Sequence, residues 1–386
     1  MRVQRPEVLL QSMVLSLDVH REDGMHEWAQ ITVRYFLSDS FRVVVSGLPP
    51  SLWWAENTAV RILYGPTPGI SREFVGYVVS PELLLTSGQP HFAGGQTIDV
   101  RYTLLGATKH MQSARQRTWR TCTAAYMARQ IGQEAGMAVL APDHARLFGV
   151  RQQALQSDFS FLQNRAEEIG WRLAMSGTLL TLTDPRQPLE RYEPRFEQHQ
   201  MPGRQDTMTA FQAVSGETDP SGSVRAHHTS MGLSPAGQIS AAAYSAPRWD
   251  LVSSETVPAQ VSRFDTKQVV QSYTDAASVV QAAASRDLWW VRGSATVDGD
   301  VRLGPGCVVQ LGGAALTRQY QGRWMVLSAH HRITVNHVDR TRSTFHTDVE
   351  LGRDQPTSLT TLPTASLPVT ENALVGGRWN ARRRRA

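Results

Sequence analysis

The chain has 386 residues, of which 41% are hydrophobic and 19% charged, and its net charge at pH 7 is +5. This composition is typical of a globular β-rich protein and excludes an intrinsically disordered chain. No run of 18 apolar residues occurs, and residues 1–6 lack an apolar signal core. We therefore expect no membrane segment and no signal peptide, with synthesis in the cytoplasm.

Residues 1–108 carry short strands that are separated by turns rich in Gly and Pro. Apolar residues alternate with polar ones in residues 27–37, 60–64, 74–79 and 97–104. Several short strands with such turns are typical of a sandwich or a barrel. The pattern predicts a first β-barrel in this part of the chain.

Residues 109–184 change to a mixed pattern that predicts a small α/β domain of two helices and a hairpin. Apolar residues at helical spacing predict a first helix over Thr118–Gly136. Ser157 is the expected N-cap of the second helix, and Gly170 is the expected left-handed residue after it. One face of that helix is apolar: Phe159, Leu162, Ala166 and Ile169.

A hairpin is expected to follow the second helix directly. Apolar residues alternate again through residues 171–182, and Ser176-Gly177 between the two runs suits a two-residue turn. This part of the chain contains no nucleophile motif and no phosphate loop, so we interpret it as architecture.

The remaining chain divides into three segments. Residues 185–265 read as a linker excursion followed by the first strands of a second barrel, although residues 247–264 fit no expected element. Residues 266–352 open with the best amphipathic helix, Thr266–Arg286, and continue as strands. Residues 353–386 are rich in Pro, Thr and Ser and predict an extended basic C-terminal tail without a core.

Three stretches resemble the phage tail and baseplate hub proteins of the late-control-D and VgrG-type family. They are QSDFSFLQNRAEEIGWRLAMSGTLLTL in the middle, VRILYG, REFVGYVVS and QTIDVRYTLLG before it, and the order of units after residue 266. The resemblance covers residues 1 to about 352. It implies a mainly β fold: two tail-tube-type β-barrels that are structural repeats, plus the small α/β domain.

The same resemblance implies a virion protein at the tail tip or baseplate. It would form a homotrimeric ring that adapts a six-fold tail tube to a three-fold spike or fibre and encloses a channel. The implied partners are the tail tube or distal tail protein, a separate spike or fibre protein, the tape-measure protein and DNA passing through the channel. No needle domain follows residue 352, so the spike is expected to be another chain.

No pattern in the sequence indicates catalysis, a cofactor or a metal site. His330-His331 point to opposite faces of a strand, so this pair cannot chelate one metal without a bulge. Glu167 and Glu168 are neighbours in a predicted helix, so their side chains also point in different directions. Cys122, in a predicted helix, and Cys307, in a predicted strand, are expected to be buried free thiols. We therefore do not expect an enzyme.

Two groups of residues are candidates for interfaces and one for the channel. Tryptophan pairs suggest one ring in the core and one at a subunit interface, and the terminal arginine run could dock on a partner or contact DNA. Three further arginines could line the channel from inward strand faces. The interface candidates are Trp53, Trp54, Trp289, Trp290, Arg382, Arg383, Arg384 and Arg385; the channel candidates are Arg292, Arg302 and Arg318.

Two other function classes stay open. A tail-tip peptidoglycan hydrolase could assemble its carboxylates from distant residues, and it would clear purified cell walls. A basic nucleic-acid-binding module would bind DNA tightly with a steep salt dependence that is lost without residues 382–385.

Overall fold

A computed structural model describes most of the chain. It covers residues 2–4, 12–37, 54–67, 70–84, 96–144, 146–189, 192–199, 207–215, 226–233, 239–245, 248–249, 256–257, 261–264, 282, 289, 291–336 and 343–353. Within these residues no helix is both long and apolar enough to cross a membrane. The predicted helix Thr266–Arg286 lies outside them except for Ala282, which is helical, and so does the tail from residue 354 onward.

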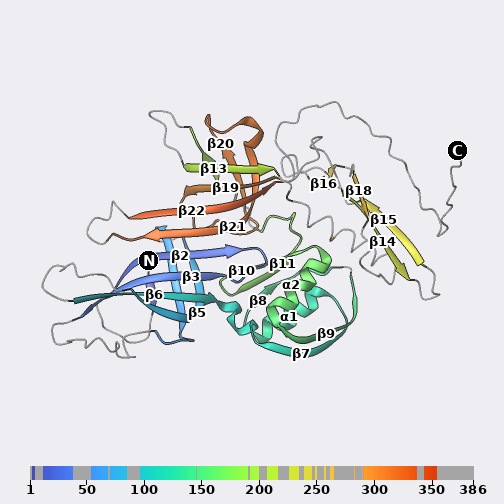
Figure 1. The fold of residues 1–386 in the computed structure, drawn as a ribbon, viewed down its shortest axis with the longest axis horizontal. Coiled ribbons are helices and arrows are strands. Elements are labelled where there is room, and N and C mark those ends of the chain that lie inside the picture. Colours follow the sequence, from blue (N-terminus) through green and yellow to red (C-terminus); the bar gives the residue numbers. More distant parts are fainter. Residues whose placement is uncertain are drawn as a thin grey trace.

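One twelve-stranded sheet, mostly antiparallel, runs through the molecule, and Figure 1 labels most of its strands, from β13 to β5. Its strands fall into two sets, which we call the first half and the second half. The first half contains β1 (Arg2–Gln4), β2 (Ser12–Glu22), β3 (Trp28–Leu37), β4 (Ala59–Thr67), β5 (Ile70–Leu84) and β6 (Gln96–Gly106). The second half contains β12 (Arg195–Glu197), β13 (Met208–Ser215), β19 (Val291–Asp298), β20 (Val308–Gly312), β21 (Gly322–Thr334) and β22 (Thr344–Arg353).

The two halves are a structural repeat. The first half has the spatial order β4-β5-β6-β3-β2, and the second has β20-β21-β22-β19-β13. In chain order, the strands β2, β3, β4, β5 and β6 correspond to β13, β19, β20, β21 and β22. Within its half, each strand has the same neighbours as its counterpart. One pairing differs: β1 adds to β4 antiparallel, whereas β12 adds to β20 parallel.

Irregularities of the strands repeat as well. β5 is bulged between Val78 and Ser80, and β21 is bulged between Val326 and Ser328. A second bulge lies between Val14 and Ser16 of β2, matching one between Met208 and Ala210 of β13. Bulges are specific features that re-aim a strand. Their recurrence therefore aligns the halves residue by residue.

Backbone turns support the same alignment. Asn57 and Gly306 both have positive φ, at 66° and 86°. Each donates its backbone N–H to the equivalent residue of the long strand, Asn57 to the carbonyl of Val78 at 2.9 Å and Gly306 to that of Val326 at 2.9 Å. The repeat thus extends from strand order to single hydrogen bonds.

Each half is built around its own apolar core. In the first half, alternate residues of β2, β3, β4 and β6 are buried, and the Arg21 guanidinium of β2 lies 5.9 Å from the ring centroid of Tyr64 on β4. Since β2 and β4 are at opposite ends of this set, the sheet curls back on itself. The second half surrounds Trp324, which is fully buried. The mainly β fold class is therefore confirmed, and the two halves share one sheet.

The halves join where β2 pairs antiparallel with β21, which we call the seam. Seven residue pairs make it, from Ser16 opposite Thr334 to Glu22 opposite Ser328. In Figure 1 the two strands lie side by side at the middle of the molecule. The seam is a regular antiparallel pairing of two strands, so the two halves form one continuous sheet surface.

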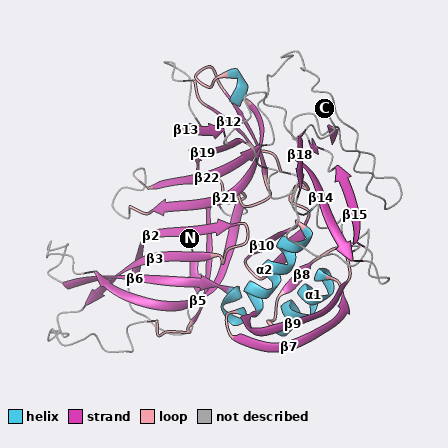
Figure 2. Ribbon diagram, turned by 45° about the vertical axis from the view of Figure 1, so that its right-hand side comes forward, coloured by secondary structure: helices cyan, strands magenta, loops and turns pink. Residues whose placement is uncertain are grey.

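A small α/β unit lies between the halves in sequence and forms a third core. Its helices α1 and α2 lie above a curved two-stranded ribbon in Figure 2. Its elements are η2 (Ala107–Met111), β7 (Ala114–Cys122), α1 (Ala124–Glu134), β8 (Ala138–Leu140), β9 (Phe148–Ser157), α2 (Asp158–Ile169), β10 (Arg172–Ser176) and β11 (Leu179–Thr183).

Local signals located α2 correctly and α1 only in part. Ser157 accepts a hydrogen bond from the Ser160 amide, and Gly170 is left-handed, as predicted. The first helix begins at Ala124, not at Thr118, because Thr123 is its N-cap and the residues before it pair with β9. Cys122 accordingly ends a strand.

Other predicted boundaries move by one or a few residues. The hairpin turns at Gly177-Thr178, one residue later than expected, because Gly177 takes the positive φ of 58°. Cys307 precedes β20 instead of lying within it, and both cysteines are buried and free. The remaining described pieces are β14 (Ala226–Leu233), β15 (Ile239–Ser245), β16 (Arg248–Trp249), β17 (Thr256–Val257), β18 (Val261–Phe264) and η3 (Arg318–Tyr320).

Candidate functional site on the shared polar face

One face of the continuous sheet is polar across both halves. Along β2, Leu17, Val19 and Arg21 are buried, and the residues between them point to the other face. Successive strand residues alternate between faces, so the pairing register decides which residues become neighbours. We call this surface the shared polar face.

Register places its residues in three rows across the seam. The first row runs from Asp18 through Arg332 to His346. The second runs from Trp28 through His20 and His330 to Asp348, and the third from Glu22 through Ser328 to Glu350. Ser294 and Thr296 of β19 continue the rows into the second half.

Aromatic stacking fixes the middle row at the seam. The rings of His20 and Trp28 stack with centroids 5.2 Å apart, and those of His20 and His330 meet edge to face at 5.7 Å. His330 Nε2 lies 3.5 Å from a carboxylate oxygen of Asp18. The histidines are therefore held in place by both halves.

Carboxylates outnumber guanidinium groups near the seam. Burial, followed by the neighbouring His330, lowers the pKa of His20, whereas Glu350 opposes this shift. Burial and the charge of Glu350 both raise the pKa of Glu22. Arg332 is engaged with Asp348 at 3.0 Å. At neutral pH the rows around the seam thus carry more acidic than basic charge.

A shallow hollow of about 530 Å³ lies on this face. Its walls come from five strands of both halves: β2, β13, β19, β21 and β22. Among the described residues no group of three His, Cys, Asp or Glu side chains is arranged to hold a metal ion. The hollow is lined by charged side chains and hydroxyls together with apolar side chains such as Phe211 and Val349.

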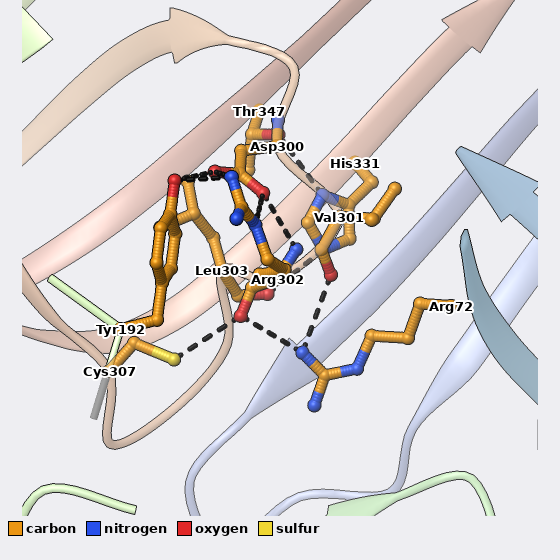
Figure 3. Close-up of polar contacts among 9 residues, drawn as sticks. All are labelled: Arg72, Tyr192, Asp300, Val301, Arg302, Leu303, Cys307, His331 and Thr347. Carbon is orange, nitrogen blue, oxygen red and sulfur yellow. Dashed lines mark hydrogen bonds and ion pairs between the residues drawn. The ribbon is translucent and has the colours of Figure 1, made fainter. Parts of the chain in front are cut away.

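Below the shared polar face, Arg72 of β5 connects all three units, and Figure 3 shows it beside the loop that precedes β20. Its Nη1 donates to the carbonyls of Val301 at 3.3 Å and Arg302 at 3.0 Å, and its Nη2 donates to Ser176 Oγ at 2.8 Å. Hydrogen bonds from a charged group are stronger than neutral ones. Arg72 therefore ties the first half to the second half and to the α/β unit.

His331 fastens the same loop from the second half. Its Nε2 donates to the Leu303 carbonyl at 3.1 Å, and its Nδ1 lies 3.0 Å from the hydroxyl of Thr347. Burial, reinforced by the charges of Arg21 and Arg72, holds the pKa of His331 well below its usual value. The ring is neutral, which suits one donor and one acceptor.

The predicted channel residue Arg302 lies in this loop and is already engaged. It contacts both carboxylate oxygens of Asp300 and stacks 3.5 Å above the Tyr192 ring, whose hydroxyl it also meets. Burial alone would raise the pKa of Asp300, but hydrogen bonds from Arg302 and Tyr192 leave it below its usual value. Arg302 therefore holds segment 192–199 against the loop.

The other predicted site residues are scattered. Arg292 lies on the same side of β19 as Ser294 and Thr296, so it belongs to the shared polar face. Arg318 lies in η3, which is not a strand. Trp54 is 6% exposed and stacks on Tyr102 at 4.5 Å, so its ring lies in the core of the first half. Trp289 packs against Val308 and Met325. The remaining candidates, Trp53, Trp290 and Arg382–Arg385, lie outside the described residues.

Sequence reasoning missed most of the shared polar face. Alternation along residues 16–22 marks Asp18, His20 and Glu22 as one side of a strand, and this signal is visible in the sequence. The partners of these residues are more than 300 positions away, however, and only the seam brings them together. Spacing along the chain cannot reveal such neighbours.

Comparison with known proteins rests on structure. No protein-family model and no curated protein sequence matches the chain. Three solved structures share its fold, each with a TM-score of 0.56. One is a type VI secretion system component from E. coli that exhibits structural similarity to the T4 bacteriophage tail proteins gp27 and gp5; at 11% identity the alignment covers 93% of this chain and 78% of that one.

The other two are tail proteins. The tail protein of Neisseria meningitidis MC58 is 12% identical over 88% of this chain and 92% of its own. The 43 kDa tail protein of prophage MuSo2 from Shewanella oneidensis is 11% identical over 89% of this chain and 95% of its own. The chain therefore has the fold of phage tail hub-type proteins, in agreement with the resemblance of its sequence.

Proposed function

We propose that this protein is a structural hub at the tip of a phage tail or a related injection machine. Three copies would form a ring, and each copy would contribute its two equivalent halves. Six similar units then face a six-fold tail tube, while the ring keeps the three-fold symmetry that a spike or fibre requires. The observation that carries this proposal is the repeat of strand order, bulges and turn hydrogen bonds in one chain.

The shared polar face is the surface that we assign to the channel. It is continuous across the seam, and a repeated surface of this kind can line a bore without gaps. Its acidic rows, with Asp18, Glu22, Asp348 and Glu350, would repel phosphate groups. DNA and an extended tape-measure protein could then slide past, whereas a basic lining would bind the DNA backbone. The role is architectural and not catalytic.

The partners follow from this placement. On one side of the ring we propose the tail tube or a distal tail protein, and on the other a separate spike or fibre protein. The molecule would be located in the virion, at the tail tip or baseplate. The fold is shared with proteins described as tail proteins and as a type VI secretion component, which supports this class of role.

Native mass spectrometry of the purified chain, alone and with the tail tube protein of the same system, tests the proposal. We expect a trimer that joins tube rings with three hub chains for every six tube chains. A chain that stays monomeric at micromolar concentration and never associates with the tube would contradict the hub. Clearing of purified cell walls by the chain would instead favour the hydrolase alternative.

A further inference from the structure

A partly enclosed cavity of about 140 Å³ lies where the first half, the second half and the α/β unit meet. Arg21 of β2 and Arg72 of β5 line it from the first half, Ser176 from the α/β unit, and Gly304 from the loop before β20. Figure 3 shows Arg72 reaching that loop. Burial, and then the charges of these two arginines, lower the pKa of His331 nearby. The described lining contains two guanidinium groups and no carboxylate, so the cavity attracts negative charge.

The Arg21 side chain carries donors that no described residue satisfies. Its Nε donates to Glu27 Oε1 at 2.5 Å. Its Nη1 and Nη2 are buried and have no hydrogen-bond partner among the described residues, and the side chain is only 1% exposed. A buried charged donor without an acceptor is strongly unfavourable, and such groups are rare in native proteins. An acceptor is therefore expected beside these two nitrogens.

Gly304 leaves room for such an acceptor next to both arginines. A Cβ at this position would lie 3.8 Å from Arg72 Nη1 and 3.9 Å from Arg21 Cδ. Any side chain here would therefore fill the space that faces both arginine side chains. Gly304 is not among the glycines with positive φ, so its own backbone conformation does not demand glycine.

The volume of the cavity and its donors favour a small oxyanion. Pockets for organic ligands usually enclose roughly 300–1,000 Å³, whereas this cavity has room for a few water molecules, each of which needs at least about 10 Å³. The planar guanidinium fork matches the oxygens of phosphate and similar anions. Apolar lining residues such as Met175 and Leu189 lower the local dielectric constant and strengthen this attraction. Water could accept from Arg21, but it carries no charge to place beside two guanidinium groups.

We propose that this cavity binds a small inorganic oxyanion, such as phosphate or sulfate, between Arg21, Arg72 and the open face of Gly304. The ion accepts hydrogen bonds from Nη1 and Nη2 of Arg21. Because the lining comes from all three units, the bound ion stabilises their junction, as a structural ligand and not as a substrate. This site is independent of the proposed hub function.

Isothermal titration calorimetry with sodium phosphate tests the proposal on the full chain, purified without phosphate or sulfate and kept in chloride buffer at constant ionic strength. We expect one phosphate bound per chain, with sulfate competing for the same site. Saturating phosphate should also raise the Tm by at least about 2 °C, because a ligand that binds only the folded state stabilises it. AMP should bind at least about tenfold more weakly, because a nucleoside does not fit in about 140 Å³.

Two glycine variants distinguish this cavity from the protein surface. Gly304→Ala adds a methyl group at ordinary contact distance from both arginines, so the chain should fold and bind phosphate at least about tenfold more weakly. Gly149→Ala is the matched control, because a Cβ there meets nothing within 4 Å and Gly149 is not among the glycines with positive φ. Its phosphate affinity should equal that of the parent chain.

A double variant tests the donors themselves. Arg21→Met with Glu27→Gln removes both charges of the buried pair, so neither is left alone in the interior. The new amide oxygen can still accept from the Gly177 backbone N–H, as Glu27 Oε2 does at 2.9 Å. Phosphate should no longer bind or raise the Tm of this variant. Circular dichroism checks its fold, and if it does not fold, Gly304→Ala decides alone.

Three results would overturn the proposal. The parent chain could bind neither phosphate nor sulfate, which would leave water as the occupant of the cavity. Gly304→Ala could bind phosphate as tightly as Gly149→Ala, which would mean an adventitious ion on the surface only. AMP could bind as tightly as phosphate, which would place the ion at an open site. A chain that forms the expected trimer but gives any of these results keeps the hub and loses the ion site.

Discussion

Asp23 lies at the contact between the first half and the α/β unit, where burial of its carboxylate is energetically unfavourable. It follows β2, its backbone N–H donates to the Leu327 carbonyl at 3.2 Å, and one carboxylate oxygen lies 3.7 Å from Arg172 Nη1. The other carboxylate oxygen is buried without a hydrogen-bond partner among the described residues. Burial raises the pKa of Asp23 to about 7, and Arg172 offsets only part of this shift.

This pKa predicts how stability depends on pH. Between pH 4 and 7 the folded state keeps a proton on Asp23 that the unfolded state loses, so this residue's contribution to stability falls as pH rises through that window. Asp23→Asn should therefore raise the free energy of unfolding at pH 8 by about 1 kcal/mol, a value discounted for partial exposure, and change it little at pH 4.5.

Thermal denaturation at both pH values measures this effect. The control is Asp143→Asn, because Asp143 is 74% exposed in a surface pair with Arg129. It should shift the Tm equally at the two pH values. An Asp23→Asn variant that is no more stable than the parent at pH 8 would show that Asp23 is adequately solvated or paired.

The sequence predicted the role of single residues correctly where that role depends only on neighbouring residues in the chain. Ser157 and Gly170 cap α2 with their own side chain and backbone conformation, so both could be read directly. Asp23 gave no such signal, because its burial depends on Leu327 and Arg172, which are far away in the chain. The cost of burying a polar group is set by the fold.

Among the elements, the ribbon of β7 and β9 shows how tertiary pairing overrides a local pattern. Helical spacing predicted a helix from Thr118, yet residues 114–122 form a strand that buries Trp119 and Cys122 under the helices. Strand preference depends on what a strand packs against. The sequence around Thr118 does not reveal that β9, about 30 residues later, will pair with it.

The ribbon also contains a strained residue. Leu155 has φ of 54°, is 82% exposed, and is the extra residue at the bulge opposite Arg115 and Gln116. A left-handed conformation costs an L-residue roughly 1 kcal/mol, and Gly adopts it without that cost. Leu155→Gly should therefore raise the free energy of unfolding by about 1 kcal/mol.

Urea denaturation of two variants tests this prediction. Val150 is 61% exposed on the same strand and is not among the residues with positive φ. Val150→Gly should lower stability by roughly 1 kcal/mol, because Gly weakens a strand. If both glycine variants lose stability, Leu155 contributes packing that outweighs its backbone strain.

At the scale of the whole molecule, the repeat was expected only from the resemblance. The aligned pairs share apolar character but not identity: Leu17 corresponds to Phe211, Val19 to Ala213 and Tyr77 to Met325. A core requires apolar volume, and many residues supply it. Strand order and bulges are therefore preserved where residue identity is not, and self-comparison of the sequence cannot detect them.

The seam predicts that the two halves unfold together. Ile31 is fully buried in the first half, and Ile31→Ala should cost about 3 kcal/mol. If the halves are coupled, hydrogen exchange of β19 in the second half should accelerate to match the new global stability. Exchange that changes in β3 but not in β19 would show that the halves open independently.

The seam also has a mechanical consequence. A load directed along β2 and β21 stretches the hydrogen bonds of all seven residue pairs at once, whereas a load across the strands would open them one after another. The protomer is therefore stiff against sliding of one half past the other. In the ring that we propose, thrust applied at one end would reach the other end as displacement of a rigid body, with little of it lost to internal deformation.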